Sequence, residues 1–442
     1  MISTSLALAE RHVPRYTSYP TAPHFTGGIS SKTYAEWLAV LPKAASVSVY
    51  IHVPFCVELC HYCGCTTKAT RSREPIDAYV DVLRREIALL QGISGRKVTH
   101  LHWGGGTPSI LGADSLCQVV ESLARIFDLS ALQEHAIELD PRRTGPELVQ
   151  RLADLGLTRA SLGVQDFTPA VQRAMGRVQP FDLVERVTGN LRDAGIEAIN
   201  FDLMYGLPNQ TVLDAACTAS LAASLGPDRI ALFGYAHVPW FKSHQRLIDS
   251  SSLPGVNERL AQSAAASQML GRAGYVSVGL DHFALPHDRL AQAAGDATVR
   301  RNFQGYTTDQ APILIGLGAS AIGQMPQGYV QNAPDVAGYT RAINARTFAT
   351  ARGLAFSDED RVRAAIIESL MCEFNVDLAE FGGRERFADE IESLDELVDA
   401  GFLIVTGGRI TLTESGRPFV RLAASAFDAY LARANKQHSI AV

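Results

Sequence analysis

The sequence predicts an α/β fold: a partial barrel of six strand–helix units, with an N-terminal extension and a mainly helical C-terminal domain. Residues 47–236 alternate short runs of branched and aromatic residues with stretches of helical period, which is typical of parallel βα units. The chain has 442 residues, more than one hydrophobic core usually organises. We therefore expect one barrel-sized domain and at least one smaller part.

Six segments have the composition of buried strands and are bounded by Gly, Pro or Asp. They are VSVYIHV from Val47, VTHLHW from Val98, HAIELD from His135, RASLGV from Arg159, AINFDLMYG from Ala198 and RIALFGYA from Arg229. Consecutive right-handed βα units of this kind should curl into an open barrel. The loops at the carboxyl ends of its strands are then the expected place for chemistry.

Amphipathic helices are predicted between these strands. Behind Pro75, a favourable first-turn residue, apolar residues follow the i, i+3, i+4, i+7 rule as far as Leu90. The same period predicts further helices over 114–127, 146–155, 181–194, 212–225 and 258–273.

Changes in the sequence pattern set the predicted boundaries in the rest of the chain. A strand is predicted over 275–283, and two short strands around Gly407 and Gly408 followed by a helix resemble a winged-helix-like cap. The predicted domains are an extension contributing to the substrate site (1–45), the barrel (46–240), a barrel extension or lid (241–350) and a mainly helical cap (351–442).

Composition and charge exclude several classes of function. The formal net charge is -6 and charged residues make up 19% of the chain, so a generic nucleic-acid-binding surface is not expected. No uninterrupted apolar run approaches the roughly 20 residues that a membrane span needs. Glu10 and Arg11 interrupt the apolar N-terminal stretch, which predicts a cytoplasmic protein without a secretory leader.

Four of the seven cysteines fall within one short segment, YIHVPFCVELCHYCGC. Cys56, Cys60 and Cys63 have C-x3-C-x2-C spacing, and Cys65 follows two residues later, directly after the first strand. Three thiolates can each hold one iron of a [4Fe-4S] cluster and leave the fourth iron open. Zinc is the alternative, but zinc knuckles normally close all four ligand positions. The other cysteines are interpreted as core residues: Cys117, Cys217 and Cys372.

At these residues the chain resembles the radical S-adenosylmethionine superfamily, and Tyr62 before the last cysteine also fits its motif. The resemblance implies that Cys56, Cys60 and Cys63 ligate a [4Fe-4S] cluster. It further implies that the open iron binds the amino and carboxylate groups of S-adenosylmethionine, which is cleaved to methionine and a 5'-deoxyadenosyl radical.

Polar residues and glycines at the ends of later strands support a ligand site at the same mouth. Gly104, Gly105 and Gly106 lack Cβ atoms and allow close approach of a ligand to the backbone. Glu138 and Asp202 are acids within apolar strands, which are costly to bury without a partner and are therefore interpreted as facing a ligand.

Four further stretches resemble the oxygen-independent coproporphyrinogen III oxidase family of this superfamily. They are PRYTSYPTAPHF from Pro14, YGLPNQT from Tyr205, DHFALP from Asp281 and RNFQGYTT from Arg301. The resemblance implies that two propionates of coproporphyrinogen III are converted to vinyl groups, giving protoporphyrinogen IX. It implies one or two molecules of S-adenosylmethionine, with contacts from Tyr50, Gly106, Thr107, Glu138, Gln165, Arg177, Asp202, Ala236 and Ile322.

The same resemblance gives the remaining expectations. Tyr50 and Cys65 are the candidate catalytic residues, and the substrate candidates are Arg15, Tyr16, Arg301 and Gln304. The expected partners are coproporphyrinogen III and an electron donor such as flavodoxin or ferredoxin, and the expected state is a monomer. The chain departs from the family pattern at Gly234, where Asn is expected. A haem chaperone and a radical haem-degrading enzyme of the same superfamily are the alternatives.

Overall fold

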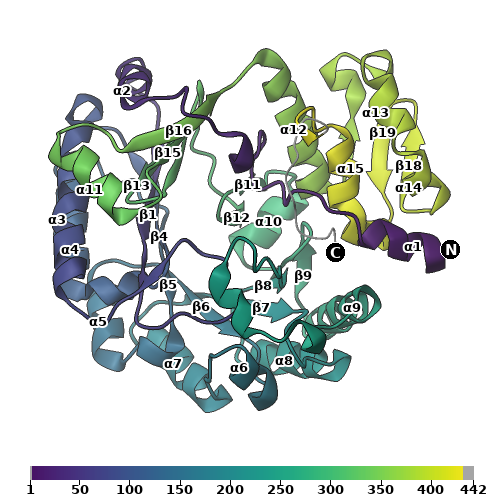
Figure 1. Ribbon diagram of the computed structural model, residues 1–442, viewed down its shortest axis with the longest axis horizontal. Helices are drawn as coiled ribbons and strands as arrows, with labels where there is room; N and C mark the ends of the chain where they lie inside the picture. The colour runs from purple at the N-terminus through teal and green to yellow at the C-terminus, as the bar shows by residue number, and fades with distance from the viewer. Residues whose placement is uncertain (1, 432–442) are drawn as a thin grey trace. The chain divides into compact units, whose positions relative to one another are not determined.

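The computed structural model describes residues 2–431, which form two compact units built from separate stretches of the chain (Figure 1). The sheet unit contains Phe25–Asp202 and Asp309–Ala355. The cap unit contains the residues up to His24, Leu203–Thr308 and the residues from Phe356. The ends of the predicted extension and cap, residues 1 and 432–442, lie outside the described residues. The linear four-part division remains a prediction.

The sheet unit is built on the parallel strands that the sequence predicts. β1 (Val47–Val53), β4 (Val98–Gly105), β5 (Glu134–Leu139) and β6 (Arg159–Gln165) pair in that order, and β7 (Ala198–Tyr205) follows β6. Every one of these strands begins within one residue of its predicted start. The branched residues that predicted them are buried, as Val49, Ile51 and Ile137 illustrate.

A second group of strands extends this sheet on the other side of β1 and was not predicted. β13 (Leu314–Leu317) pairs parallel with β1, and β14 (Ile322–Met325), β15 (Gly328–Asn332) and β16 (Thr350–Ala355) continue antiparallel. The sheet is therefore mixed rather than a run of parallel βα units alone.

Helices flank these strands close to their predicted positions. α3 spans Glu74–Leu89, α4 Ala113–Ala124, α5 Pro146–Asp154 and α7 Phe181–Asp193. The apolar positions of α3 are buried, including Tyr79 and Leu83. The remaining elements of this unit are short: α2 (Ser31–Ala39), β2 (Phe55–Cys56), β3 (Lys68–Ala69), α6 (Pro169–Ala174) and α11 (Val336–Asn344).

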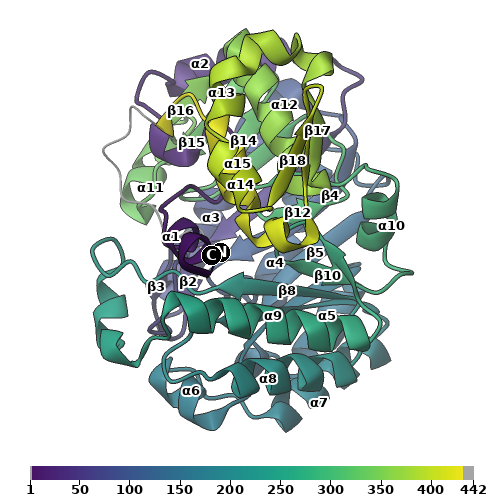
Figure 2. The same cartoon turned by 90° about the vertical axis from the view of Figure 1, so that its right-hand side faces the viewer.

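In the cap unit, the last residues of β7 are followed in strand order by β8 (Arg229–Gly234), β10 (His282–Ala284) and β9 (Val276–Val278). α8 (Val212–Ser224) and α9 (Val256–Arg272) pack side by side (Figure 2). The single strand predicted over 275–283 is wrong, because the chain turns at Gly279 with φ +55° and forms the β9–β10 pair. Such a left-handed conformation favours glycine.

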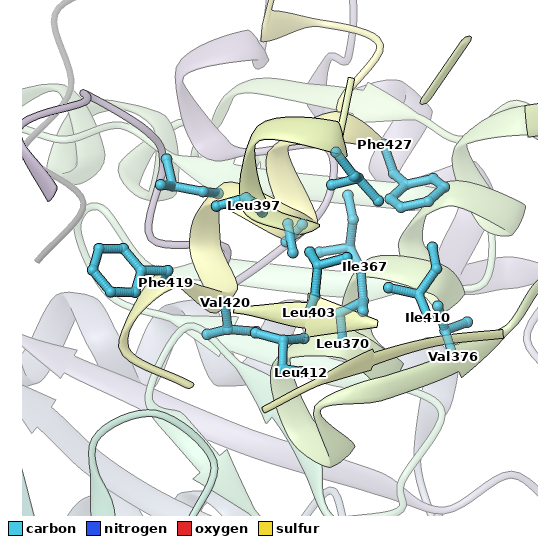
Figure 3. Close-up of a cluster of buried hydrophobic side chains, with 14 of the residues drawn as sticks. Ile367, Leu370, Val376, Leu397, Leu403, Ile410, Leu412, Phe419, Val420 and Phe427 are labelled. Atoms are coloured by element: carbon cyan, nitrogen blue, oxygen red, sulfur yellow. The ribbon is translucent and has the colours of Figure 1, made fainter. Parts of the chain in front are cut away.

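A large hydrophobic core of the cap unit surrounds α12 (Asp358–Glu373) and α15 (Val420–Ala426) (Figure 3). β18 (Leu403–Thr406) and β19 (Arg409–Leu412) form the hairpin expected around Gly407 and Gly408. The N-terminal residues Leu8, Val13, Tyr16 and Tyr19 belong to the same core. The other elements of the unit are α1 (Ile2–Ala9), α10 (Arg289–Gly295), β11 (Arg300–Asn302), β12 (Gly305–Thr307), β17 (Asn375–Asp377), α13 (Ala388–Glu392) and α14 (Asp395–Asp399).

Across residues 2–431, no helix combines the length and the apolar character that crossing a bilayer would require.

Candidate active site

The cysteine loop, residues 56–65, follows β1 directly in the sheet unit. Cys56 ends β2, whose pairing with β3 fixes its backbone, and its carbonyl accepts a hydrogen bond from the Thr70 amide at 2.8 Å. The hydroxyl of Thr107 donates to Cys56 Sγ at 3.5 Å, and Thr67 Oγ1 lies 3.3 Å from the same sulfur. Two hydroxyl groups therefore lie within hydrogen-bonding distance of the Cys56 sulfur.

Two arginines converge on the buried sulfur of Cys60. Arg142 Nη2 donates to Sγ at 3.7 Å and Arg177 Nη1 donates at 3.6 Å. Both guanidiniums also pair with Asp140, at 2.7 and 3.3 Å. Burial acts to raise the pKa of Asp140, but the hydrogen bond from Arg142 and the two positive charges outweigh it and lower the pKa. Two guanidiniums against one carboxylate leave net positive charge beside the Cys60 sulfur.

Cys63 and Cys65 complete the loop. The amide of Cys65 donates to Cys63 Sγ at 3.4 Å. The pKa of the Cys65 thiol is raised, first by its side-chain hydrogen bond with Cys63 and then by desolvation. Its side chain is nevertheless exposed to solvent. Cys65 therefore lies beside the three-cysteine motif on an exposed part of the loop.

Cys56, Cys60 and Cys63 each accept at least one hydrogen bond, as cluster thiolates do. Within the described part of the chain, no group of three or more His, Cys, Asp or Glu side chains is spaced to hold one metal ion. A [4Fe-4S] cluster takes one thiolate per iron and so does not need sulfurs that converge on one point.

The three glycines at the end of β4, residues 104–106, bring the backbone close to its neighbours. The Gly106 amide donates to the Val53 carbonyl and the Thr107 amide to the Phe55 carbonyl, each at 2.8 Å. A Cβ at Gly106 would collide with the Phe55 carbonyl oxygen, and Gly105 has φ +112°. These contacts require glycine here and place Gly106 and Thr107 against the segment that leads into the cysteine loop.

Glu138 and Tyr50 lie together beside this glycine segment. Glu138 Oε2 accepts a hydrogen bond from the Gly105 amide at 3.0 Å, and His102 Nε2 lies 3.5 Å from Oε1. The Tyr50 ring stacks on His102, with centroids 5.9 Å apart, and its hydroxyl lies 3.1 Å from His52 Nδ1. Burial raises the pKa of Tyr50, so its hydroxyl remains protonated.

β6 and β7 supply the next predicted residues, Gln165 at the end of β6 and Asp202 within β7. Gln165 is buried in a left-handed conformation with φ +69°, next to Gly163, whose carbonyl accepts from Arg177 Nη2 at 2.7 Å. Asp202 accepts hydrogen bonds from Ser161 Oγ at 3.2 Å and Asn200 Nδ2 at 3.0 Å. These donors fix the position of the Asp202 carboxylate within β7.

The two remaining predicted contacts lie in different units. Ile322 begins β14 in the sheet unit, and a Cβ at Gly316 of the neighbouring strand would lie 2.6 Å from its carbonyl oxygen. Ala236 lies in the cap unit after β8, and its carbonyl accepts from Gln245 Nε2 at 3.3 Å. All the predicted adenosylmethionine contacts except Ala236 therefore belong to the sheet unit.

Sequence reasoning missed His52, His102, Asp140 and Arg142. The two histidines alternate with buried residues along β1 and β4, so period-2 counting would have placed them on one face with Tyr50 and Gly104. Asp140 and Arg142 directly follow the strand that carries Glu138, which was the available signal.

The substrate candidates lie in the cap unit. Arg15 Nη2 donates to the Gly234 carbonyl at 2.9 Å, and Arg301 Nε donates to the Tyr16 carbonyl at 3.1 Å. The Tyr16 hydroxyl donates to Asp428 at 3.0 Å. Gln304 lies exposed in the turn between β11 and β12 and is separate from these hydrogen bonds.

The sequence and the fold are similar to those of known proteins. The radical SAM superfamily model matches residues 50–221, and the HemN C-terminal domain model matches residues 356–419. The chain is 47% identical to the oxygen-independent coproporphyrinogen III oxidase of Bradyrhizobium diazoefficiens, with 99% of each chain covered. It is 36% identical to the Escherichia coli K12 enzyme of that name, with 97% of this chain and 96% of the relative covered.

The solved structure of coproporphyrinogen III oxidase (HemN) from Escherichia coli, described as a radical SAM enzyme, matches with a TM-score of 0.90 and 34% identity. The match covers 95% of this chain and 100% of that structure. The chain belongs to the family of oxygen-independent coproporphyrinogen III oxidases, within the radical SAM superfamily.

Proposed function

We propose that this protein decarboxylates two propionate side chains of coproporphyrinogen III to vinyl groups in haem biosynthesis, without oxygen. The observation that carries the proposal is the 47% identity to a relative of that name over nearly the whole of both chains, with the cysteine loop intact. Each propionate would lose one hydrogen atom and CO2, and the remaining electron would leave to an acceptor.

Membership of the superfamily implies a [4Fe-4S] cluster and S-adenosylmethionine. When bound, they supply one-electron cleavage of the sulfonium and a 5'-deoxyadenosyl radical that abstracts the propionate hydrogen. Cys56, Cys60 and Cys63 would hold the cluster, because all three lie on one loop and their sulfurs accept hydrogen bonds. We extend the proposal to a second molecule of S-adenosylmethionine.

The residues at the strand ends would bind and orient S-adenosylmethionine. Glu138 and Asp202 would accept hydrogen bonds from its amino group and hydroxyls, since each carboxylate is already held by neighbouring donors. Gly106 and Thr107 would lie along the methionyl part, where a Cβ at Gly106 finds no space. Arg177 would offer positive charge to a carboxylate, and the further proposed contacts are Tyr50, Gln165, Ala236 and Ile322.

Within the cap unit, Arg15 and Arg301 are the proposed partners of the substrate carboxylates, with Tyr16 and Gln304 as further contacts. Guanidiniums bind carboxylates in a planar, bidentate geometry. Tyr50 and Cys65 are proposed to act in turnover. We further propose a monomer that receives electrons from flavodoxin or ferredoxin.

An anaerobic assay of the reconstituted protein tests this function. Coproporphyrinogen III, S-adenosylmethionine and a reductant are supplied, and protoporphyrinogen IX and 5'-deoxyadenosine are quantified. Both products should form, and replacement of all three motif cysteines by Ala should abolish both. Formation of 5'-deoxyadenosine without any porphyrinogen product would show that the substrate is another molecule.

A further inference from the structure

Four arginines of the cap unit form a group that we call the arginine cluster: Arg15, Arg259, Arg301 and Arg421. They come from the N-terminal segment, α9, β11 and α15, and they interact electrostatically with one another. The neighbouring carboxylates are Asp281 and Asp428. Among the described residues, the cluster therefore brings four guanidiniums near two carboxylates.

Two of these arginines hold the backbone of the N-terminal segment. Arg421 donates to the carbonyls of Val13 and Pro14, at 2.6 and 3.0 Å. Arg301 donates to the next two carbonyls, of Tyr16 at 3.1 Å and of Arg15 at 3.4 Å. Four consecutive carbonyls of the N-terminal segment are thus held by two buried guanidiniums, which fixes the backbone that carries the Arg15 side chain.

Arg259 makes no such hydrogen bonds to the described residues. The residue is 8% exposed, and among the described residues its guanidinium has no hydrogen-bond or ion-pair partner. Its one close ring contact is with Tyr205, 5.6 Å from the ring centroid. Burial and the neighbouring Arg15 act to lower its pKa. A largely buried guanidinium whose Nε has no hydrogen-bond partner is costly, which points to a ligand that compensates it.

Gly234 connects Arg259 with Arg15. The Gly234 carbonyl accepts from Arg15 Nη2 at 2.9 Å, while a Cβ at Gly234 would lie 3.1 Å from Arg259 Nη2 and 2.9 Å from the Tyr205 hydroxyl. Arg15 is accessible to solvent, although desolvation lowers the pKa of its guanidinium. Two guanidiniums and a phenol therefore lie around one residue, Gly234.

We propose that Arg259 and Arg15, on either side of Gly234, bind one propionate carboxylate of the substrate. The inference rests on the proposed function and adds Arg259 to the residues that recognise the porphyrinogen. A carboxylate fits this place because it accepts hydrogen bonds from several planar donors and neutralises part of their positive charge.

Binding of coproporphyrin III, the stable oxidised form of the substrate, tests the proposal by calorimetry on the reconstituted protein. Arg259→Met should weaken binding about 10- to 100-fold, as expected for loss of a charge-assisted contact. Arg259→Lys should recover part of that loss. Arg272→Met is the matched control, because Arg272 is an exposed arginine of the same helix, and its affinity should not change.

Two further measurements separate recognition from structure. The tetramethyl ester of coproporphyrin III lacks carboxylates, so its binding should be insensitive to Arg259→Met. The thermal midpoint of Arg259→Met should stay unchanged or rise, because the variant removes an unpartnered buried charge. A lowered midpoint, or equal loss of affinity for acid and ester, would make Arg259 structural and overturn the proposal.

Failure of the role proposed for Arg259 and failure of the proposed function would give different binding results. Wild-type protein that binds coproporphyrin III, together with an Arg259→Met variant of equal affinity, contradicts the role of Arg259 and leaves the proposed function standing. Wild-type protein that does not bind coproporphyrin III contradicts the proposed substrate, and the inference with it.

Discussion

Arg142 donates from Nη2 to the sulfur of Cys60 at 3.7 Å, across 82 residues of sequence. A cation hydrogen-bonded to a cluster thiolate stabilises the reduced state, because reduction adds negative charge to the cluster. Arg142→Met should therefore give a more negative midpoint potential with unchanged iron content. A charge-assisted hydrogen bond of about 1.5 kcal/mol corresponds to roughly 60 mV for one electron.

The potential is measured by anaerobic titration followed by electron paramagnetic resonance. Arg143→Met is the control, since Arg143 is the next residue, is exposed and lies 3.8 Å from Glu58. Equal potentials in Arg142→Met and wild type would show that this contact does not tune the cluster.

Glu138→Gln and Asp202→Asn should each weaken binding of S-adenosylmethionine about 10-fold while cluster content stays normal. The geometry of Glu138 is held by the Gly105 amide, so removal of the charge should act mainly on the ligand. Anaerobic calorimetry measures the affinity. Glu147→Gln, an exposed acid in the first turn of α5, should bind as wild type does. Unchanged affinity in both site variants would remove these carboxylates from the binding site.

The parallel strands could be predicted because their signal is local. β1, β4 and β6 are runs rich in branched and aromatic residues, and each begins where the sequence predicts. β13 and β14 are only four residues long and are surrounded by glycine, so their pairing depends on the edge offered by β1. The positive φ of Gly279, which splits the strand predicted over 275–283, is set by its three-dimensional surroundings.

The candidate site also contains residues that the sequence could predict and residues that it could not. The cysteine spacing is a local pattern, and the strand-end acids follow from the strand assignment. The roles of Arg142 and Arg259 depend on contacts between distant segments, so neither could be identified as a site residue from its neighbours in sequence. The unpartnered state of Arg259 in particular is visible only when the whole cap unit is folded.

Cys65→Ser should keep a normal iron count and cluster spectrum but greatly reduce decarboxylation of coproporphyrinogen III. Serine is nearly isosteric with cysteine and is neither as acidic nor redox-active. The amide of Cys65, which donates to Cys63 Sγ, is retained in this variant, so cluster assembly should be unaffected. Iron analysis and product formation are measured on the same anaerobic sample. Loss of the cluster would make Cys65 a ligand, and full activity would assign it no role in turnover.

Glu86 should make the sheet unit less stable as pH rises. Its carboxyl is buried in α3 and accepts hydrogen bonds from the Gly318 amide and the Tyr339 hydroxyl, at 2.7 and 2.8 Å. Burial raises its pKa from 4.5 to about 7, against the effect of these donors. Between those pH values the folded state holds a proton that the unfolded state has released, so the free energy of unfolding falls by about 3 kcal/mol.

Glu86→Gln has no carboxyl to titrate, so the free energy of unfolding of this variant should not fall in this way as the pH rises. Between pH 5 and pH 8, the thermal midpoint of the variant should therefore rise by several degrees relative to that of wild type. Because glutamine also changes the hydrogen bond with Asn332 Nδ2, which lies 2.7 Å from Oε1, only the change with pH is diagnostic and not the midpoint at one pH. Scanning calorimetry at matched ionic strength measures both proteins. Parallel pH profiles of variant and wild type would show that Glu86 does not titrate between these values.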